Sequence, residues 1–194
     1  MAEIRADVNE LYVAFFGRPG EAEGASYWNE FIEDAAAKGR PIDAIEQEIA
    51  ARFADADEAT GTYSFLQDPV TGDVGQFIDA VYANLFNREP EETGRNFWLE
   101  RFEELTDKGT PAEQVASLFV LEMLNAAQNA DAAHVQNKVQ IATAYSERFL
   151  ETGATFPVAD DLQTAKELIA NTGASPESLQ QAQARLEENL DANT

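Results

Sequence analysis

The chain has no cysteine among its 194 residues and a single histidine, His134. The missing thiol excludes a disulfide scaffold, a thiolate metal site and a cysteine nucleophile. A lone histidine without a placed partner is more often structural than catalytic or metal-binding. The sequence also contains no G-x-S-x-G, no H-E-x-x-H and no phosphate-binding loop. We therefore expect a protein that is not an enzyme.

Long apolar runs are also missing from the sequence. No window reaches about eighteen apolar residues, so we expect no transmembrane helix and no insertion into a membrane. The first residues, MAEIRADVNELY, lack the apolar core of a secretory signal peptide. If the protein leaves the cell, we expect it to use a route that does not read an N-terminal signal.

Basic residues are few. The 13 lysines and arginines oppose 36 aspartates and glutamates, which gives a net charge of -23 and a pI near 4.1. This excess argues against binding to nucleic acid or to an anionic bilayer by charge attraction. It is compatible with solubility at high salt, with binding of divalent cations, or with a solvated acidic surface that has no specific partner.

Apolar residues recur at helical spacing along most of the chain. Ile4, Val8, Leu11 and Phe15 are separated by three or four residues, and similar stripes follow in the stretches 74–85, 115–124 and 135–149. Alternating runs of β-branched residues are absent. The sequence therefore predicts an all-α fold of about seven to nine helices.

Several helix ends have chemical signals. We expect the hydroxyl of Thr110 at an N-cap, with a proline next and with Glu113 close to the cap amide. Ser175 marks a similar helix start without the reciprocal glutamate. Gly39 and Gly109, each of which follows a lysine, are expected to end helices.

The sequence repeats itself after seventy residues. Residues 4–53 align without a gap on residues 74–123, and the matches in one register include Tyr12 with Tyr82, Phe16 with Phe86, Arg18 with Arg88, Gly24 with Gly94, Trp28 with Trp98 and Pro41 with Pro111. The sequence thus predicts two tandem three-helix units, residues 1–58 and 59–128. The remaining residues, 129–194, are expected to form C-terminal helices that pack on both units in one compact domain.

The two turns GRPGEAEG and NREPEETG are the centre of the repeated unit. A first helix is expected to end before each turn, and a second to begin near Gly24 or Gly94. Each tryptophan would pack across the turn on the tyrosine of its own unit, while each arginine would bond to turn carbonyls and a nearby glutamate. On this interpretation the motif is a structural brace, and its aromatic rings are largely buried: Tyr12, Phe16, Trp28, Tyr82, Phe86 and Trp98.

A binding role for the same motif is the alternative. Aromatic rings stack on sugars and arginine binds anionic groups, so the motif is also a candidate glycan site. Its residues would be Arg18, Tyr27, Trp28, Arg88, Asn96 and Trp98. The groove between the two units is where we expect a ligand.

The stretches LYVAFFGRPGEAEGASYW and VYANLFNREPEETGRNFW resemble the signature of the DUF4214 family, which is itself similar to the phycobilisome linker domain. The later stretch NKVQIATAYSERF resembles a segment that follows DUF4214 units in bacterial surface proteins. The tail AKELIANTGASPESLQQAQARL resembles the helix–turn–helix that closes the same region. The resemblance covers about Ile4 to Leu190, and the order of the motifs is more specific than any single one.

This resemblance implies a place at the bacterial cell surface. Proteins with this region are commonly exported by type I secretion and include S-layer proteins and RTX-type adhesins. In S-layer relatives the region anchors the protein to lipopolysaccharide. The resemblance thus implies a secreted anchoring module that binds lipopolysaccharide or another surface glycan, with other copies of the same protein as further partners. The calcium repeats of RTX proteins, G-G-x-G-x-D, are missing here.

Calcium is the one cofactor that the residues suggest. Two stretches, ADADEATG and DPVTGD, gather carboxylates that we expect in loops: Asp55, Asp57, Glu58, Asp68 and Asp73. Neither stretch matches an EF-hand, and solvated acidic loops are the alternative. Divalent ions would also bridge this acidic chain to an acidic lipopolysaccharide surface.

Two classes of function remain open at this point. The first is anchoring to a surface glycan. The second is a protein–protein linker that organises other proteins, as phycobilisome linkers do. Those linkers commonly contact acidic partners through basic surfaces, and this chain has the opposite charge.

Overall fold

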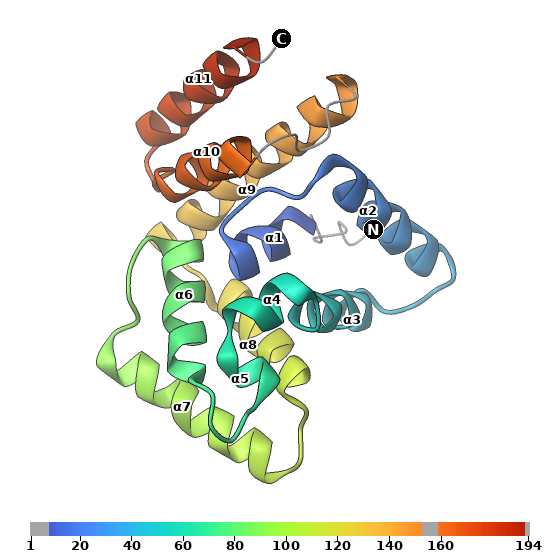
Figure 1. Ribbon diagram of the computed structural model, residues 1–194, viewed down its shortest axis with the longest axis vertical. Helices are drawn as coiled ribbons and strands as arrows, with labels where there is room; N and C mark the ends of the chain where they lie inside the picture. Colours follow the sequence, from blue (N-terminus) through green and yellow to red (C-terminus); the bar gives the residue numbers. More distant parts are fainter. Residues whose placement is uncertain (1–7, 153–158, 193–194) are drawn as a thin grey trace.

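The structure is a computed structural model that describes residues 8–152 and 159–192. These residues form helices and connecting turns without a strand, which confirms the all-α class. Eleven helices are present in this part of the chain (Figure 1): α1 Val8–Phe16, α2 Ala22–Ala37, α3 Ile42–Ala54, α4 Asp57–Thr62, α5 Ser64–Gln67, α6 Val74–Phe86, α7 Glu92–Asp107, α8 Ala112–Ala126, α9 Asn129–Thr152, α10 Ala159–Ala170 and α11 Pro176–Ala192.

The number of helices is larger than the expected seven to nine, partly because two short helices occupy the stretch between α3 and α6. Helix α4 has six residues and α5 has four. The hydroxyl of Tyr63, between these helices, donates to the carbonyl of Phe15 at 2.6 Å. The stretch ADADEATG, which we expected in a loop, is therefore partly helix α4, whereas DPVTGD lies between α5 and α6 and is a loop as expected.

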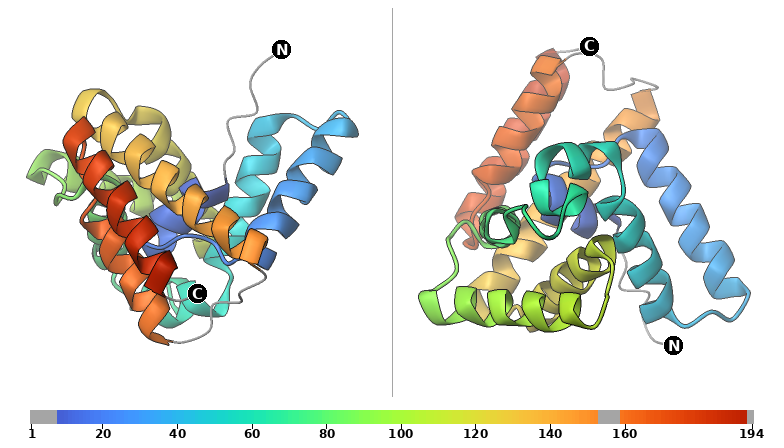
Figure 2. Two further views of the ribbon diagram at one scale, coloured as in Figure 1. Left: turned by 90° about the horizontal axis from the view of Figure 1, so that it is seen from above. Right: turned by 60° about the horizontal axis from the view of Figure 1, so that its bottom comes forward.

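Helix α1 lies at the centre of the molecule. Its apolar side chains are almost fully buried, and it contacts α2, α3, α4, α6, α8 and α9. Seen from above, α1 lies between the pair α2 and α3 on one side and the helices α9, α10 and α11 on the other (Figure 2). Burial of a short helix on several sides explains its mostly apolar sequence, VNELYVAFF.

The second helices of the two repeats have matching bounds. Helices α2 and α7 each have 16 residues, and the bounds of α7 are those of α2 moved by seventy. We call residues 8–54 the first copy and residues 74–126 the second copy. Their third helices, α3 and α8, pack along each other, and their first helices, α1 and α6, are also in contact. The division into two tandem units stays a prediction from the sequence.

The two predicted glycine stops are confirmed. Gly39 and Gly109 both have φ +77° and follow the last residue of α2 and of α7 by two positions. The amide of Gly39 donates to the carbonyl of Ala36 and the amide of Arg40 to that of Ala35, and α7 ends with the same pair of bonds. These bonds satisfy carbonyls that the helix itself leaves free.

One predicted helix start is correct and the other is wrong. The hydroxyl of Ser175 accepts from the amide of Ser178 at 3.1 Å, as expected for an N-cap. Helix α8, in contrast, begins at Ala112, and its N-cap is Pro111 rather than Thr110. Pro111 has extended backbone angles, and its carbonyl accepts from the amide of Val115 at 3.0 Å. The proline thus precedes the helix instead of opening it.

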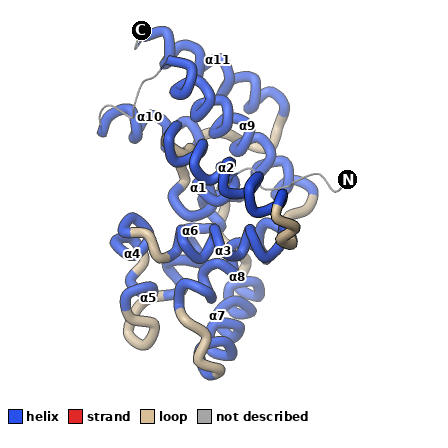
Figure 3. The backbone as a smooth tube through the Cα atoms, turned by 90° about the vertical axis from the view of Figure 1, so that its right-hand side faces the viewer, coloured by secondary structure: helices blue, strands red, loops and turns tan. Residues whose placement is uncertain are grey.

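Helix α9 joins the C-terminal helices to both copies. It is 24 residues long and contacts α1, α2, α6, α10 and α11 (Figure 3). Its fully buried Lys138 donates to the carbonyls of Ala83 and Asn84 at the end of α6. The neighbouring Asn137 donates to the carbonyl of Gly173 at 2.8 Å, in the turn before α11. These two side chains tie the second copy to α9 and α9 to the last two helices. None of the helices in the described ranges has the length and apolar character needed to cross a membrane.

Candidate binding site

Arg18 is a buried cation in the turn after α1, with only 4% of its surface exposed. Its Nε and Nη2 donate to the two carboxylate oxygens of Glu58, at 3.0 and 2.6 Å. Its Nη1 donates to the carbonyl of Pro19 at 3.0 Å and lies 2.8 Å from Glu21. The guanidinium also lies over the ring of Tyr12, 5.1 Å from its centroid. Every face of the group is used within the fold, so Arg18 is a brace and is not available to an external anion.

The surroundings of Tyr12 show the same burial. Burial and the negative charge of Glu21 raise the pKa of the Tyr12 hydroxyl to about 12. The ring of Tyr12 meets that of Phe53 edge-on, with centroids 4.7 Å apart. The ring of Trp28 packs on the same Phe53 at 5.7 Å. In the first copy the tyrosine and the tryptophan therefore both pack on Phe53.

The second copy has the same brace in a more exposed form. Nε and Nη2 of Arg88 donate to the carboxylate of Asp131, at 3.1 and 2.6 Å, and Nη1 donates to the carbonyl of Glu89. The guanidinium lies over the rings of Tyr82 and Phe86. The hydrogen bond and charge of Asp131 raise the pKa of Arg88. Both arginines thus bond to a turn carbonyl as predicted, but the expected nearby glutamate is present only in the first copy, as Glu21, because Arg88 pairs with Asp131 of α9.

The two tryptophans are placed differently. Trp98 is buried, its Nε1 donates to the hydroxyl of Tyr82 at 3.2 Å, and its ring packs on Phe119. Trp28 is half-buried, and the guanidinium of Arg52 lies over its ring. Of the six rings that we expected to be largely buried, three are, namely Tyr12, Phe86 and Trp98, while three are only partly covered, namely Phe16, Trp28 and Tyr82. Both tryptophans are therefore mainly packing residues, and Trp98 has no free face for a sugar.

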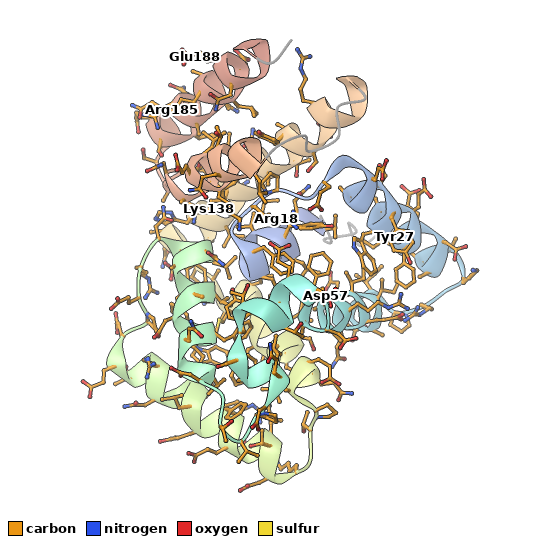
Figure 4. The ribbon with its side chains drawn as sticks, viewed as in Figure 1. Arg18, Tyr27, Asp57, Lys138, Arg185 and Glu188 are labelled. Carbon is orange, nitrogen blue, oxygen red and sulfur yellow. The ribbon has the colours of Figure 1, made fainter. Side chains whose placement is uncertain are left out.

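Two aromatic rings are exposed at the same position of the two copies. Tyr27 on α2 is 54% exposed and Phe97 on α7 is 55% exposed. Each ring meets the neighbouring tryptophan edge-on at an interplanar angle of 74°, with centroids 4.9 Å apart for Tyr27–Trp28 and 5.1 Å apart for Phe97–Trp98. Figure 4 shows Tyr27 on α2, on the side of the molecule away from α11.

Sequence reasoning included Tyr27 and missed Phe97. The candidate glycan site contained Tyr27, Asn96 and Trp98, whereas the shift of seventy residues places Tyr27 on Phe97. Asn96 is exposed beside Phe97, whereas Trp98 is turned into the core. The alignment of the two copies could have indicated Phe97, because it places one aromatic residue on another.

The five candidate calcium ligands do not form one site. The carboxylate of Glu58 holds Arg18, that of Asp73 accepts from the amide of Gln76 at the start of α6, and Asp68 accepts from Thr71 and the amide of Val70. The hydroxyl of Thr71 and the loop amides lower the pKa of Asp68. Asp55 and Asp57 are exposed. Across residues 8–152 and 159–192, no three carboxylate or imidazole groups are grouped in a way that would hold a metal ion.

His134 lies on α9, near the turn between α10 and α11. Its Nδ1 is buried and has no hydrogen-bond partner, and burial lowers the pKa of the ring. It belongs to no group of three carboxylate or imidazole side chains in the described chain that could hold a metal ion. A structural role for His134 stays a prediction.

A cavity of about 420 Å³ opens between the two copies, where we expected a ligand. Helices α1, α2 and α3 of the first copy form one wall, and α8 of the second copy forms the other together with α9. Most of its lining is aliphatic, and its polar lining residues are Glu10, Glu46, Asn125 and Gln136.

Comparisons with known proteins identify no relative. No family model matches the sequence, and neither a curated protein nor a solved structure matches it. The likeness of the repeated turns to the DUF4214 signature therefore stays a prediction.

Proposed function

We propose that this chain is a non-enzymatic binding module that attaches a secreted bacterial surface protein to cell-surface glycan through Tyr27 and Phe97. The observation that carries the proposal is the exposure of an aromatic ring at the same position of both copies, with 54% of Tyr27 and 55% of Phe97 accessible. A single exposed aromatic residue is ordinary in a folded protein. An exposed aromatic ring at the same position of both copies, next to a tryptophan that packs within the fold, is less easily explained without a ligand.

The geometry of each ring suits stacking on a sugar. The apolar face of a pyranose ring can cover the face of an aromatic side chain. The tryptophan next to each exposed ring restricts the movement of that ring. The edge-on contact with Trp28 or Trp98 holds each exposed ring at a defined angle. Less conformational entropy is then lost when a ligand binds.

The charges near Tyr27 indicate which glycans fit. Glu23 and Glu30, four residues before and three residues after Tyr27 on α2, are both exposed. These carboxylates favour neutral sugar units next to the ring. Phosphorylated parts of a lipopolysaccharide would need divalent cations between them and this face. We therefore propose the neutral repeats of a surface polysaccharide as the ligand.

Two rings on one chain would also act together. Helices α2 and α7 lie at separate edges of the molecule (Figure 1). A polysaccharide presents the same unit many times, so one chain bound at both edges gains affinity from the second contact. Export by type I secretion, a place in an S-layer or adhesin, and contact with other copies belong to the same proposal. They rest on the resemblance of the repeated turns to DUF4214 proteins.

The proposal is tested by titrating the purified chain with lipopolysaccharide and with the polysaccharide released from it, each with calcium and with a chelator. Calorimetry gives the affinity, and tryptophan emission reports on rings that touch Trp28 and Trp98. We expect Tyr27→Ala or Phe97→Ala to weaken binding, and the double variant to lose about a hundredfold in affinity. Val70→Ala is the matched control, because Val70 is another exposed hydrophobic residue, with 89% of its surface accessible.

Two results would overturn the glycan proposal. The first is unchanged polysaccharide binding in the double variant, or an equal loss in Val70→Ala. The second is no polysaccharide binding by the native chain, together with self-association in sedimentation experiments that the double variant abolishes. That second result would assign the rings to protein–protein assembly, the role that the likeness to phycobilisome linkers implies.

A further inference from the structure

Two arginines share one carboxylate at the edge of the molecule where α2 and α3 lie side by side (Figure 2). Nη2 of Arg40 and Nη2 of Arg52 each donate to one oxygen of Glu48, both at 2.5 Å. These hydrogen bonds, that from Arg40 first, hold the pKa of Glu48 below its usual value. The chain as a whole has 36 acidic and 13 basic residues. Two positive charges around one negative charge are therefore the reverse of its overall balance.

Aromatic rings of α2 hold both guanidinium groups in place. The Cζ atom of Arg40 lies 6.0 Å from the centroid of Phe31. That of Arg52 lies 5.3 Å from the same centroid and 5.9 Å from the centroid of Trp28. The two rings meet edge-on, with their centroids 5.8 Å apart. The arginines are thus oriented by the rings and by Glu48 before any ligand arrives, so less conformational entropy is lost when one binds.

Both guanidinium groups keep most of their donors open to solvent. A guanidinium has five N–H groups. In the part of the chain that the structure describes, Arg40 and Arg52 each make one hydrogen bond, to Glu48, and no other carboxylate lies within 4 Å of them. The two side chains are 39% and 49% exposed. Arg18 is enclosed by its partners, whereas this pair can accept a second carboxylate from outside.

The second copy has a different set of residues at the equivalent positions. Phe31, Arg40, Glu48 and Arg52 are replaced there by Arg101, Thr110, Leu118 and Glu122. Arg101 lies 3.0 Å from Glu104 and 3.8 Å from Glu122, so one positive charge faces two negative ones. Helices α7 and α8 nevertheless contact each other as α2 and α3 do. The repeated fold therefore does not need the arginine pair, which is a property of the first copy alone.

We propose that Arg40 and Arg52 form a binding site for a small organic carboxylate. Glu48 shows that one carboxylate spans the two guanidinium groups, with one oxygen on each. A ligand carboxylate would use the remaining N–H groups of the same pair, in the forked geometry that guanidinium offers to carboxylates. The net charge of -23 repels polyanions and favours a ligand with a single negative charge. This inference does not depend on the glycan proposal, which assigns neutral sugar units to Tyr27 and Phe97.

The chemistry of the ligand is tested with three probes that share one sugar ring: glucuronate, glucose 6-phosphate and glucose. Nuclear magnetic resonance follows the Nε–H signals of the arginines during each titration, at about 0.15 M salt, where the repulsion by distant acidic residues is screened beyond about 8 Å. We expect glucuronate to shift the signals of Arg40 and Arg52 in a saturable way. Glucose should leave them unchanged, and glucose 6-phosphate should bind more weakly because it has two negative charges. Shifts of equal size with glucose, or tighter binding of glucose 6-phosphate, would overturn the proposal.

The location is tested with variants that separate the forked geometry from the charge. Arg52→Lys keeps the positive charge and removes the fork, and Arg40→Gln removes one of the two guanidinium groups. We expect each to weaken glucuronate binding about tenfold, because charge-assisted hydrogen bonds are lost. Their matched control is Arg101→Gln, which removes one positive charge from the equivalent edge of the second copy. This control should leave the affinity for glucuronate unchanged.

These variants keep the outcomes distinct. If Arg101→Gln weakens glucuronate binding as much as Arg40→Gln does, the probe senses only net charge and the proposal is wrong. Unchanged binding in Arg52→Lys would show that no fork is used and would overturn it as well. Phe97→Ala removes one ring of the glycan proposal from the other copy and should leave glucuronate binding unchanged, so failure of the glycan proposal is visible separately.

Discussion

Arg18 and Glu58 are forty residues apart in sequence and form a two-pronged ion pair, with Nε–Oε1 and Nη2–Oε2 distances of 3.0 and 2.6 Å. Burial disfavours the charged guanidinium, but the hydrogen bonds and charge of Glu58 and the charge of Glu21 outweigh it, so the pKa of Arg18 is raised. The pair connects the turn after α1 to the short helix α4. It therefore holds the central helix of the fold in place.

Removing the negative partner should destabilise the protein strongly. Glu58→Gln keeps the shape of the side chain but leaves the buried Arg18 with one carboxylate fewer. We expect the free energy of unfolding in urea to fall by about 3 kcal/mol, since the buried guanidinium loses its two-pronged carboxylate partner and keeps only Glu21. The second copy supplies the matched control, Asp131→Asn. Its partner Arg88 has 42% of its side chain exposed, so the expected loss there is within about 1 kcal/mol. Equal losses at the two sites would contradict this account.

Lys138 should make stability depend on pH in the alkaline range. Burial lowers the pKa of its ammonium group to about 8 from its ordinary value of 10.5. Between these two values the unfolded chain binds more protons than the folded chain, so stability rises with pH. At lower pH both forms are protonated and the slope vanishes. Since one pKa unit corresponds to about 1.4 kcal/mol, we expect the free energy of unfolding to rise by about 2 kcal/mol from about pH 8 to about pH 10.

The measurement is the difference between the native chain and Lys138→Met across this range. The difference removes the titration of the tyrosines, which is common to both proteins. Tyr12 and Tyr63 have pKa values raised to about 12, so their ionisation in the unfolded chain opposes the lysine effect toward the upper end of the range. A difference that stays constant from pH 8 to pH 10 would show that Lys138 is charged in the folded protein throughout.

The sequence was informative where one residue type has one physical use. Gly39 and Gly109 end their helices because a positive φ favours glycine, and this could be predicted from the residues alone. The helical spacing of apolar residues predicted the all-α class, because residues three or four positions apart share one face of a helix. Thr110 was misplaced because a hydroxyl, a proline and a glutamate fit two neighbouring registers, and only the backbone angles of Pro111 distinguish them.

Long-range partners were beyond such reasoning. The need of Arg18 for an acidic partner was foreseen, but its assignment to Glu58 depends on how α4 folds back on α1. Tyr12 and Trp28 both pack on Phe53 of α3, which no local pattern indicates. The cavity depends on the side chains of five helices. The sequence alone shows only that some lining residues differ between the copies, such as Glu46, which aligns with Ala116.

The hydroxyl of Tyr63 should matter more than that of Tyr82. Tyr63 is buried and donates to the carbonyl of Phe15 at 2.6 Å, in the last turn of α1. Tyr63→Phe leaves this carbonyl without its side-chain donor, so we expect thermal or urea unfolding to report a loss of about 1 to 3 kcal/mol. Tyr82→Phe removes a half-buried hydroxyl that accepts from Trp98. Water can replace it, and its loss should be smaller. The reverse order would contradict the assignment of Tyr63 as a cap on α1.

Gly72 and Gly61 should respond to alanine in opposite ways. A Cβ atom at Gly72 would overlap the backbone of Phe65, which is fully buried and cannot move aside. We expect Gly72→Ala to lower the free energy of unfolding by about 1 to 3 kcal/mol, as overpacking does. A Cβ atom at Gly61, within α4, meets no neighbour within 4 Å. Gly61→Ala should therefore stabilise the protein by about 0.5 kcal/mol, because alanine loses less backbone entropy in a helix. Equal losses of stability in the two variants would show that residue 61 does not lie in a helix. That result would contradict α4 and the position of Glu58 on it.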